Sequence, residues 1–361
     1  LSLSPMSEVP AFAVGLGALG VIRRWDKDGR GVWLAISGLI LAFALEIKLT
    51  AALLAPALGL ELALLTLARS KAGRIVKLAR NGAIWGGSVL GGSVLLGLAL
   101  GTGYLQAYAS HFSTLGQAAA AEVRQLAFTL GDLLRYRQAL VALAASLGLA
   151  AWRRHWRPLA FPLALFATAL AVHLVHRPFW PYYYLHFAVP IAWLTGYAVG
   201  ELWKAALDTA RRTAPRLSLW GAGLALAAAL LSAGVVAYAG VTLASETKKI
   251  RGVRRVDADP LVAAMKAAAP GTQWVYTRAT MYAFHAKLRV IPELALMPRK
   301  RFWSGQITPA GILAQVKRYM PEQLLLDDRD MADAEMAQFV GEHYKSSTRD
   351  AGLTLWLKAA R

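Results

Sequence analysis

Residues 32–68 read VWLAISGLILAFALEIKLTAALLAPALGLELALLTLA, a run of 37 nearly uninterrupted apolar residues with Glu46 and Lys48 close to its middle. About 20 helical residues cross the hydrocarbon core of a bilayer, so this run is too long for one span. Two short spans fit it better, and they place Glu46 and Lys48 at the turn between them. An ionised side chain inside hydrocarbon costs about 2.5–3.5 kcal/mol, which favours an interface or a water-filled cavity for this polar tip.

The rest of the chain to residue 240 has the same organisation, with charges clustered between apolar blocks. Hydrophobic residues make up 57% of the sequence. Reading each block as a span predicts transmembrane helices over residues 8–22, 32–46, 49–68, 82–103, 138–152, 158–175, 183–203 and 217–240. The expected fold class is therefore an α-helical polytopic membrane protein with about eight transmembrane helices.

The distribution of Lys and Arg between the predicted loops indicates the orientation of these helices. Loops at 23–30, 69–80, 153–157 and 204–216 hold sixteen basic residues, whereas the loops on the other side hold five, namely Lys48, Arg124, Arg135, Arg137 and Arg177. The positive-inside rule then places the first set in the cytoplasm and the N-terminus outside. Treating 32–68 as one span would move the basic loop at 69–80 to the other side and abolish this bias.

Charge and cysteine content restrict the classes of function. The net charge of +19 could indicate nucleic-acid binding, but membrane topology accounts for most of it, and we expect no nucleic-acid partner. After residue 240 there are 19 basic and 12 acidic residues, a surplus that suits a domain close to anionic lipid head groups. The chain has no cysteine, which is compatible with a domain outside the cytoplasm that uses no disulfide.

Composition changes after residue 240, which predicts a second domain over 241–361. Helical patterns over 257–268, 309–319 and 332–343 alternate with strand-like stretches over 272–277, 322–327 and 352–358. Such alternation is typical of a small α/β domain. With an even number of spans, this domain lies on the same extracytoplasmic side as the N-terminus.

Polar groups from several predicted elements meet at the outer face. They are Ser7 with Glu8, Glu46 with Lys48, Ser110 with His111, and the segment from Arg177 to His186 that includes Trp180 and Tyr183. Each has an ordinary alternative role. Glu8 could cap its helix, Lys48 could extend to the interface, and the aromatic residues could form an interfacial belt. Convergence of all four elements instead predicts one cavity.

No sequence motif for a metal or a cofactor stands out. His173 and His176 are three residues apart, close enough to share a helical face, but no carboxylate accompanies them. The basic cluster 299–303, RKRFW, is either a solvated face or a contact for lipid head groups or glycan. The site prediction therefore contains no metal, and a possible divalent metal is the only cofactor left open.

Two stretches carry a family resemblance. SEVPAFAVGLGALGVIRRW (7–25) and LAFALEIKLTAALLAPALGL (41–60), with the aromatic RPFWPYYYLHFAVPIAWL (177–194), resemble bacterial C-type membrane glycosyltransferases. These are relatives of dolichyl-phosphate-mannose protein mannosyltransferases and of the lipid A aminoarabinose transferase. Glu8 matches the acidic residue that opens a helix in that superfamily, and Lys48, Thr50 and Pro56 loosely match its tip between two short helices. The resemblance covers about residues 7–240.

The resemblance implies transfer of a sugar from a polyprenyl-phosphate donor to a glycan, protein or lipid acceptor at the outer face of a bacterial cytoplasmic membrane. It implies that Lys48 and Arg177 bind the donor phosphate. Acceptor or sugar contacts are expected from Glu8, Glu46, His111, Trp180, Tyr183 and His186. The family's catalytic carboxylate lies in an outer loop that would precede Leu1, so a fragment lacking that loop is expected.

Two other classes of function fit parts of the pattern. A transporter or flippase for a lipid-linked substrate also uses cationic and aromatic groups between helices, but it usually has related halves with polar groups near mid-membrane. The sequence shows no such internal symmetry. An inactive membrane fragment that displays the C-terminal domain as a binding module is the third reading.

Overall fold

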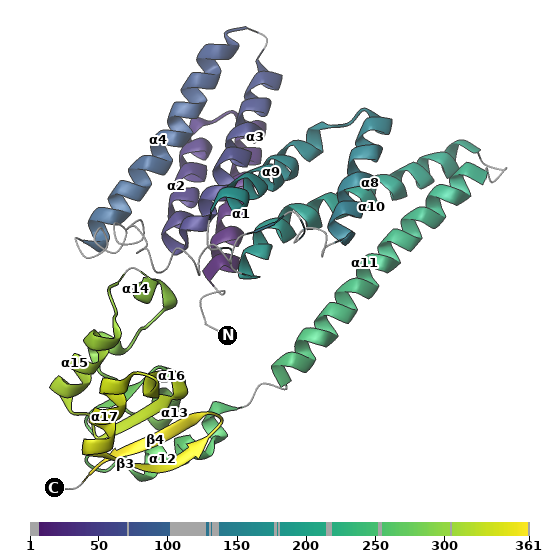
Figure 1. Cartoon of the computed structure of the whole chain (residues 1–361). Coiled ribbons are helices and arrows are strands. Elements are labelled where there is room, and N and C mark those ends of the chain that lie inside the picture. The colour runs from purple at the N-terminus through teal and green to yellow at the C-terminus, as the bar shows by residue number, and fades with distance from the viewer. Residues whose placement is uncertain are drawn as a thin grey trace. The chain divides into compact units, whose positions relative to one another are not determined.

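The computed structural model describes residues 7–70, 72–101, 128–129, 131, 137–176, 179, 181–213, 219–251, 255–303 and 305–359 (Figure 1). The chain divides into two compact units, the first reaching Tyr238 and the second beginning at Ala239. The predicted boundary at residue 240 falls close to this division, inside one long helix.

All the secondary structure described in the first unit is helical. Its helices are α1 (Glu8–Asp28), α2 (Gly31–Ile47), the short 3-10 helix η2 (Leu49–Leu53), α3 (Leu54–Arg69), α4 (Arg74–Leu100), α8 (Arg137–Arg153), η3 (Arg157–Leu159), α9 (Ala160–Val175), η4 (Pro181–Tyr184), α10 (Leu185–Thr213) and α11 (Leu219–Arg251), the last of which continues into the second unit. Among the described residues, helices therefore cover most of each of the eight ranges predicted as spans.

Four helical segments in the described part are long and apolar enough to cross a bilayer. They are Leu49–Arg69, Arg74–Leu100, Arg157–Val175 and Ala222–Lys249, and α2 is a shorter apolar helix. Large apolar side chains are exposed on α4 and α11, including Ile75, Leu98 and Val236, each at least 70% exposed. Apolar surface of this extent is costly in water and normal against lipid. The count of eight spans and the orientation remain predictions.

The predicted break in the 32–68 run is present at Lys48. Its backbone is extended, with φ −160° and ψ 125°, between the end of α2 and the start of η2. Pro56 follows in the first turn of α3, where its missing N–H has no helical partner to lose. At the other end of α2, Gly29 adopts φ +75° and its N–H donates to the Trp25 carbonyl, which ends α1.

Small residues let α1, α2 and α4 approach closely. The buried hydroxyl of Ser37 donates to the Ala18 carbonyl at 3.0 Å and accepts from the indole of Trp85 at 3.2 Å, so one side chain joins three helices. A Cβ added to Gly38 would lie 2.5 Å from the Trp85 carbonyl oxygen and 2.7 Å from Ser88 Cβ. These contacts hold α2 and α4 too close together for a larger residue at position 38.

An ion-pair cluster joins α1, α3 and η3 at the end of the unit where the basic loops lie. The fully buried carboxylate of Glu61 is 2.5 Å from Arg23 and 2.6 Å from Arg157. Nearby, the Asn81 amide donates to Thr66 at 3.2 Å, which ties α4 to α3. A buried carboxylate is tolerated when cations pair with it, so this cluster fixes the packing at what we call the basic end.

The second unit is a four-stranded sheet with helices on both faces, which agrees with the predicted α/β character. The strands are β1 (Val275–Thr277), β2 (Gln323–Asp327), β3 (Tyr344–Asp350) and β4 (Leu353–Lys358), in the order β1-β2-β4-β3. β1 and β2 are parallel, and the other pairs are antiparallel. The helices are η5 (Val256–Ala258), α12 (Pro260–Ala267), α13 (Thr280–Ala286), η6 (Pro292–Leu294), α14 (Arg299–Trp303), α15 (Pro309–Tyr319), α16 (Asp328–Met331) and α17 (Ala334–His343).

Two apolar cores flank this sheet. α12 and α13 pack on one face around Val275, Leu325 and Leu355, whereas α15 and α17 pack on the other around Tyr276 and Leu324. The predicted helix 309–319 is confirmed, and the three predicted strands shorten by one to three residues at their starts. Strand β3 was not predicted, because YKSSTRD is a polar edge strand without an alternating apolar face.

The close approach of α2 and α4 gives a stability prediction. Replacing Gly38 with Ala should lower the free energy of unfolding in mixed micelles by about 1–3 kcal/mol, because the added methyl group overlaps the α4 backbone. Gly59→Ala is the matched control, since nothing lies within 4 Å of a Cβ at that helical position. It should leave stability unchanged or raise it slightly. Equal effects of the two substitutions would contradict the described α2–α4 packing.

Candidate functional site

Glu8 and Lys48 come together at the end of the first unit opposite the basic end. Glu8 is the first residue of α1 and is fully buried, and Lys48 lies at the break after α2. The Lys48 Nζ atom is 3.9 Å from Glu8 Oε1, and the Lys48 side chain is 26% exposed. Because the ammonium is partly exposed while the carboxylate is not, the pair offers a positive charge to the surroundings.

Two buried histidines lie beside this pair. His173 in α9 and His186 in α10 are joined by a 2.8 Å contact between His173 Nε2 and His186 Nδ1, with ring planes 6° apart. Tyr183 stacks on both imidazoles, at centroid distances of 5.1 Å and 5.2 Å. Phe179 meets His173 edge-on at 5.1 Å. The histidines are therefore held in a packed aromatic shell.

Phe12 connects the two pairs. It lies one turn after Glu8 on α1, and its ring stacks on His186 at a centroid distance of 5.0 Å and an angle of 15°. We call Glu8, Lys48, His173, Tyr183 and His186 the polar-end cluster. Its residues come from α1, the break after α2, α9, η4 and α10.

Several buried polar atoms of this region have no hydrogen-bond partner among the described residues. They are both carboxylate oxygens of Glu8, Thr50 Oγ1, His173 Nδ1 and His186 Nε2. Leaving a buried polar group without a partner typically costs about 1–3 kcal/mol. Several unpaired buried polar atoms close together are expected at a binding site, where a substrate supplies the missing hydrogen-bond partners.

The structure brings together four of the predicted site residues and leaves others outside its description. Glu8, Lys48 and His186 are in one cluster, as the convergence argument predicts, and Tyr183 covers the histidines. Glu46 is half-buried in the last turn of α2, two residues before Lys48. Arg177, Trp180 and His111 lie outside the described residues, as do Ser110 and most of the 104–137 loop.

Sequence reasoning missed the role of His173 and the whole Glu61 cluster. The sequence places His173 and His176 on one helical face, but the 2.8 Å partner of His173 is His186, thirteen residues later. Among the described residues, no group of three or more His, Cys, Asp or Glu side chains could hold a metal ion. Glu61 could have been recognised, since a lone carboxylate within the apolar 32–68 run requires a cationic partner.

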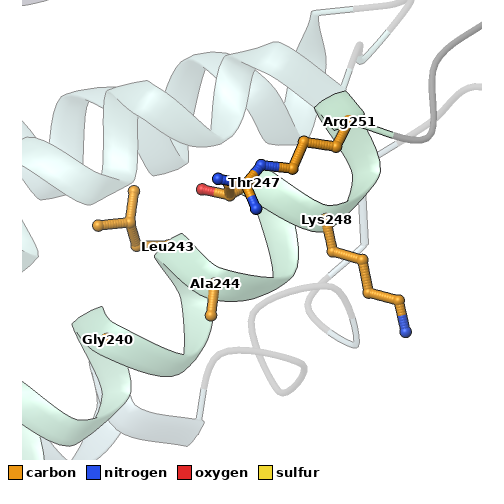
Figure 2. Close-up of a pocket in the computed structure, with 6 residues that line it drawn as sticks. All are labelled: Gly240, Leu243, Ala244, Thr247, Lys248 and Arg251. Atoms are coloured by element: carbon orange, nitrogen blue, oxygen red, sulfur yellow. The ribbon is translucent and has the colours of Figure 1, made fainter.

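A hollow of about 490 Å³ runs along the last turns of α11, bounded by Gly240, Leu243, Ala244, Thr247, Lys248 and Arg251 (Figure 2). All six residues belong to one helix. Figure 2 shows Thr247 and Arg251 pointing to one side of the helix and Lys248 to another. The two cations therefore do not converge on a common ligand position.

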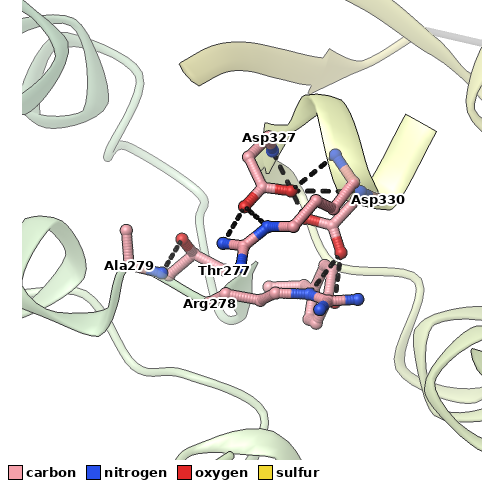
Figure 3. Close-up of polar contacts among 7 residues, drawn as sticks. Thr277, Arg278, Ala279, Asp327 and Asp330 are labelled. Carbon is pink, nitrogen blue, oxygen red and sulfur yellow. Dashed lines mark hydrogen bonds and ion pairs between the residues drawn. The ribbon is translucent and has the colours of Figure 1, made fainter. Parts of the chain in front are cut away.

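The second unit has a polar cluster where β1 and β2 end, next to a cavity of about 160 Å³ (Figure 3). Buried Asp330 accepts from Arg278 Nε at 2.6 Å and from the Tyr276 hydroxyl at 3.1 Å. Asp327 caps α16 and pairs with Arg329 at 2.5 Å. Burial raises the pKa of Asp330, against the opposing effect of Arg278. Because each carboxylate already pairs with a guanidinium, the stability of the second unit accounts for this cluster, and we assign it no function.

Comparisons with known proteins add no assignment. No protein-family model, curated protein or solved structure matches the chain. The polar-end cluster and the apolar helices around it are therefore the features from which a function can be inferred.

Proposed function

We propose that the chain is an integral membrane glycosyltransferase that moves a sugar from a polyprenyl-phosphate donor to an acceptor at the outer face of a bacterial cytoplasmic membrane. The observation that carries the proposal is the Glu8–Lys48 pair, 3.9 Å apart at the ends of apolar helices. The resemblance of residues 7–25 and 41–60 to C-type glycosyltransferases supports the same reading, since Glu8 and Lys48 are the residues that match.

Lys48 is suited to bind the phosphate of a lipid donor. Its ammonium is a compact charge at the end of α2, and it is 26% exposed, so an anion can reach it. When the bond between sugar and phosphate breaks, negative charge grows on the leaving phosphate. A cation already placed there stabilises the transition state more than the ground state. Glu8 then acts as a positioning residue that holds the ammonium.

The polar groups lie at the end of the helices, and this location favours a transferase over a transporter. Glu8 opens α1, Lys48 follows α2, and His186 is the second residue of α10. A transporter would require polar groups near the midplane between related halves. A site at the helix ends lets the prenyl chain stay in the bilayer while its phosphate is at the surface.

The substitution of Lys48 tests this proposal. Lys48→Ala in the full-length protein should reduce sugar transfer from a polyprenyl-phosphate donor by about 100-fold or more, because the charge on the leaving phosphate loses its partner. Lys48→Arg keeps the charge and should retain part of the activity. Lys77→Ala, at an exposed lysine in the first turns of α4, is the matched control and should transfer at the wild-type rate. Transfer by Lys48→Ala at the wild-type rate would remove Lys48 from the site.

The absence of cysteine makes the orientation directly testable. A single cysteine in place of exposed Lys266 in α12 should react with a membrane-impermeant maleimide in intact cells, because the C-terminal unit is expected outside. A single cysteine in place of Lys77 should react only after the cells are permeabilised. The reverse pattern would place the polar-end cluster in the cytoplasm and contradict transfer at the outer face.

A further inference from the structure

The short helix α13 of the second unit turns one face into the core and exposes another face that is partly apolar. Ala283 and Ala286, three residues apart, are buried in the core that contains Val275. Met281 and Phe284 are also three residues apart, so they share a face, and they are 43% and 70% exposed. Large apolar side chains exposed together on one face are common where a surface contacts a membrane or another protein.

Cations follow these apolar side chains at the end of the helix. Lys287 is the C-cap of α13, three residues after Phe284, and Arg289 comes two residues later; both side chains are exposed. The exposed carboxylate of Asp257, in the adjoining η5, pairs with Arg255 at 2.6 Å and so leaves the charge of Lys287 and Arg289 in place. Exposed apolar groups flanked by Lys and Arg are typical of a helix face that lies on anionic lipid. We call Met281, Phe284, Lys287 and Arg289 the α13 face.

The chain itself keeps α13 within reach of a membrane surface. The segment Ala222–Lys249 of α11 is long and apolar enough to cross a bilayer, and the last turn of α11 is basic. From Arg251, where α11 ends, to Val256 the chain advances five residues and can span at most about 18 Å. Val256 packs against the core that holds Ala283 and Ala286. Any bilayer that α11 crosses is therefore accessible to α13.

Contacts at both ends of α13 fix the direction of its exposed face. The buried carboxylate of Asp259 caps α12 by accepting from the Leu261 N–H at 2.9 Å, and it also accepts from the Tyr282 hydroxyl at 3.2 Å. After α13, Val290 forms a parallel bridge with Val275 of β1. Because the helix is tied to α12 before the face and to the sheet after it, the α13 face is a constant feature of the second unit.

We propose that the α13 face docks the second unit on the anionic lipid surface of the membrane that α11 crosses. Met281 and Phe284 enter the boundary between head groups and acyl chains, and Lys287 and Arg289 contact lipid phosphates. Because α11 tethers the face to the bilayer, its effective concentration at the surface is high, and a small contact area is enough. This docking does not depend on sugar transfer.

The charge of the α13 face favours lipid over a second copy of the chain. Two copies that met through this face would oppose two positive surfaces, whereas phospholipid phosphates bring the opposite charge. Each cation close to an anionic surface strengthens binding about fivefold. The same surface accommodates the two apolar side chains without a shaped pocket, because acyl chains rearrange around them.

The absence of cysteine allows the α13 face to be labelled at a single position. Met281→Cys in the full-length protein, carrying an environment-sensitive fluorophore, is placed in nanodiscs of phosphatidylglycerol and phosphatidylcholine with a nitroxide on the acyl chains. The label should lose about half of its emission or more, because an interfacial helix face lies about 5–10 Å into the boundary of head groups and acyl chains. Leu296→Cys is the matched control. Leu296 is 76% exposed and follows Leu294 of the core on the other face of the sheet, so its label should keep its emission.

Two sets of substitutions in the Met281→Cys protein separate the apolar and the charged contributions. Phe284→Ser should lower the ratio of docked to undocked protein by about tenfold, because its ring no longer leaves water. Lys287→Gln combined with Arg289→Gln should lower it by about tenfold or more, and nanodiscs of phosphatidylcholine alone should have a similar effect. All three side chains are exposed, so the fold tolerates these changes. Lys345→Gln, at an exposed lysine of β3 on the far edge of the sheet from β1, should leave docking unchanged.

Three results would overturn the docking proposal. They are equal quenching of the labels at positions 281 and 296, quenching at 281 that survives Phe284→Ser, and a label at 281 that is protected from aqueous iodide but is not quenched by the lipid nitroxide. The last result would mean that protein, and not lipid, covers the α13 face. Because quenching is measured without a sugar donor, its failure leaves the proposed transfer reaction to be judged by its own assay.

Discussion

The ion pair between Glu8 and Lys48 is the interaction on which the rest of the site depends. A fully buried carboxylate is stabilised by a nearby cation, and Lys48 Nζ lies 3.9 Å from Glu8 Oε1. To supply it, the chain must leave the helical conformation at Lys48, which divides the long apolar run into α2 and the η2–α3 segment. Lys48 therefore both ends α2 and pairs with Glu8.

The two ends of the first unit use buried charge differently. At the basic end, Arg157 donates a hydrogen bond to Glu61 Oε2 at 2.6 Å and Arg23 forms an ion pair with Oε1 at 2.5 Å, although Oε1 has no hydrogen bond among the described residues; these pairs join α1, α3 and η3. At the other end, the Glu8–Lys48 contact is longer, and neither Glu8 oxygen has a hydrogen-bond partner among the residues described. A tightly paired cluster serves stability. A loosely paired cluster can still bind an incoming group. We therefore assign function to the polar end.

Hydropathy was enough to predict the helices, because a membrane requires long apolar segments whatever their contacts. It also predicted the break at Lys48. The gathering of polar groups at the outer face, and not hydropathy, predicted that Lys48 and Glu8 lie at one site. Helix ends were less predictable. α4 begins at Arg74 and α11 continues to Arg251, since charged residues outside the hydrocarbon can extend a helix that hydropathy would end. The link between His173 and His186 depends on how α9 packs against α10, and no local pattern reports that packing.

The most direct test of the account is a structure of the full-length protein in nanodiscs that contain a polyprenyl phosphate. The account predicts density for the phosphate beside Lys48 Nζ, with its oxygens within hydrogen-bonding distance of the ammonium. A lipid phosphate bound elsewhere, with Glu8, Lys48 and His186 sealed from it by side chains, would contradict the central claim that this cluster is the donor site.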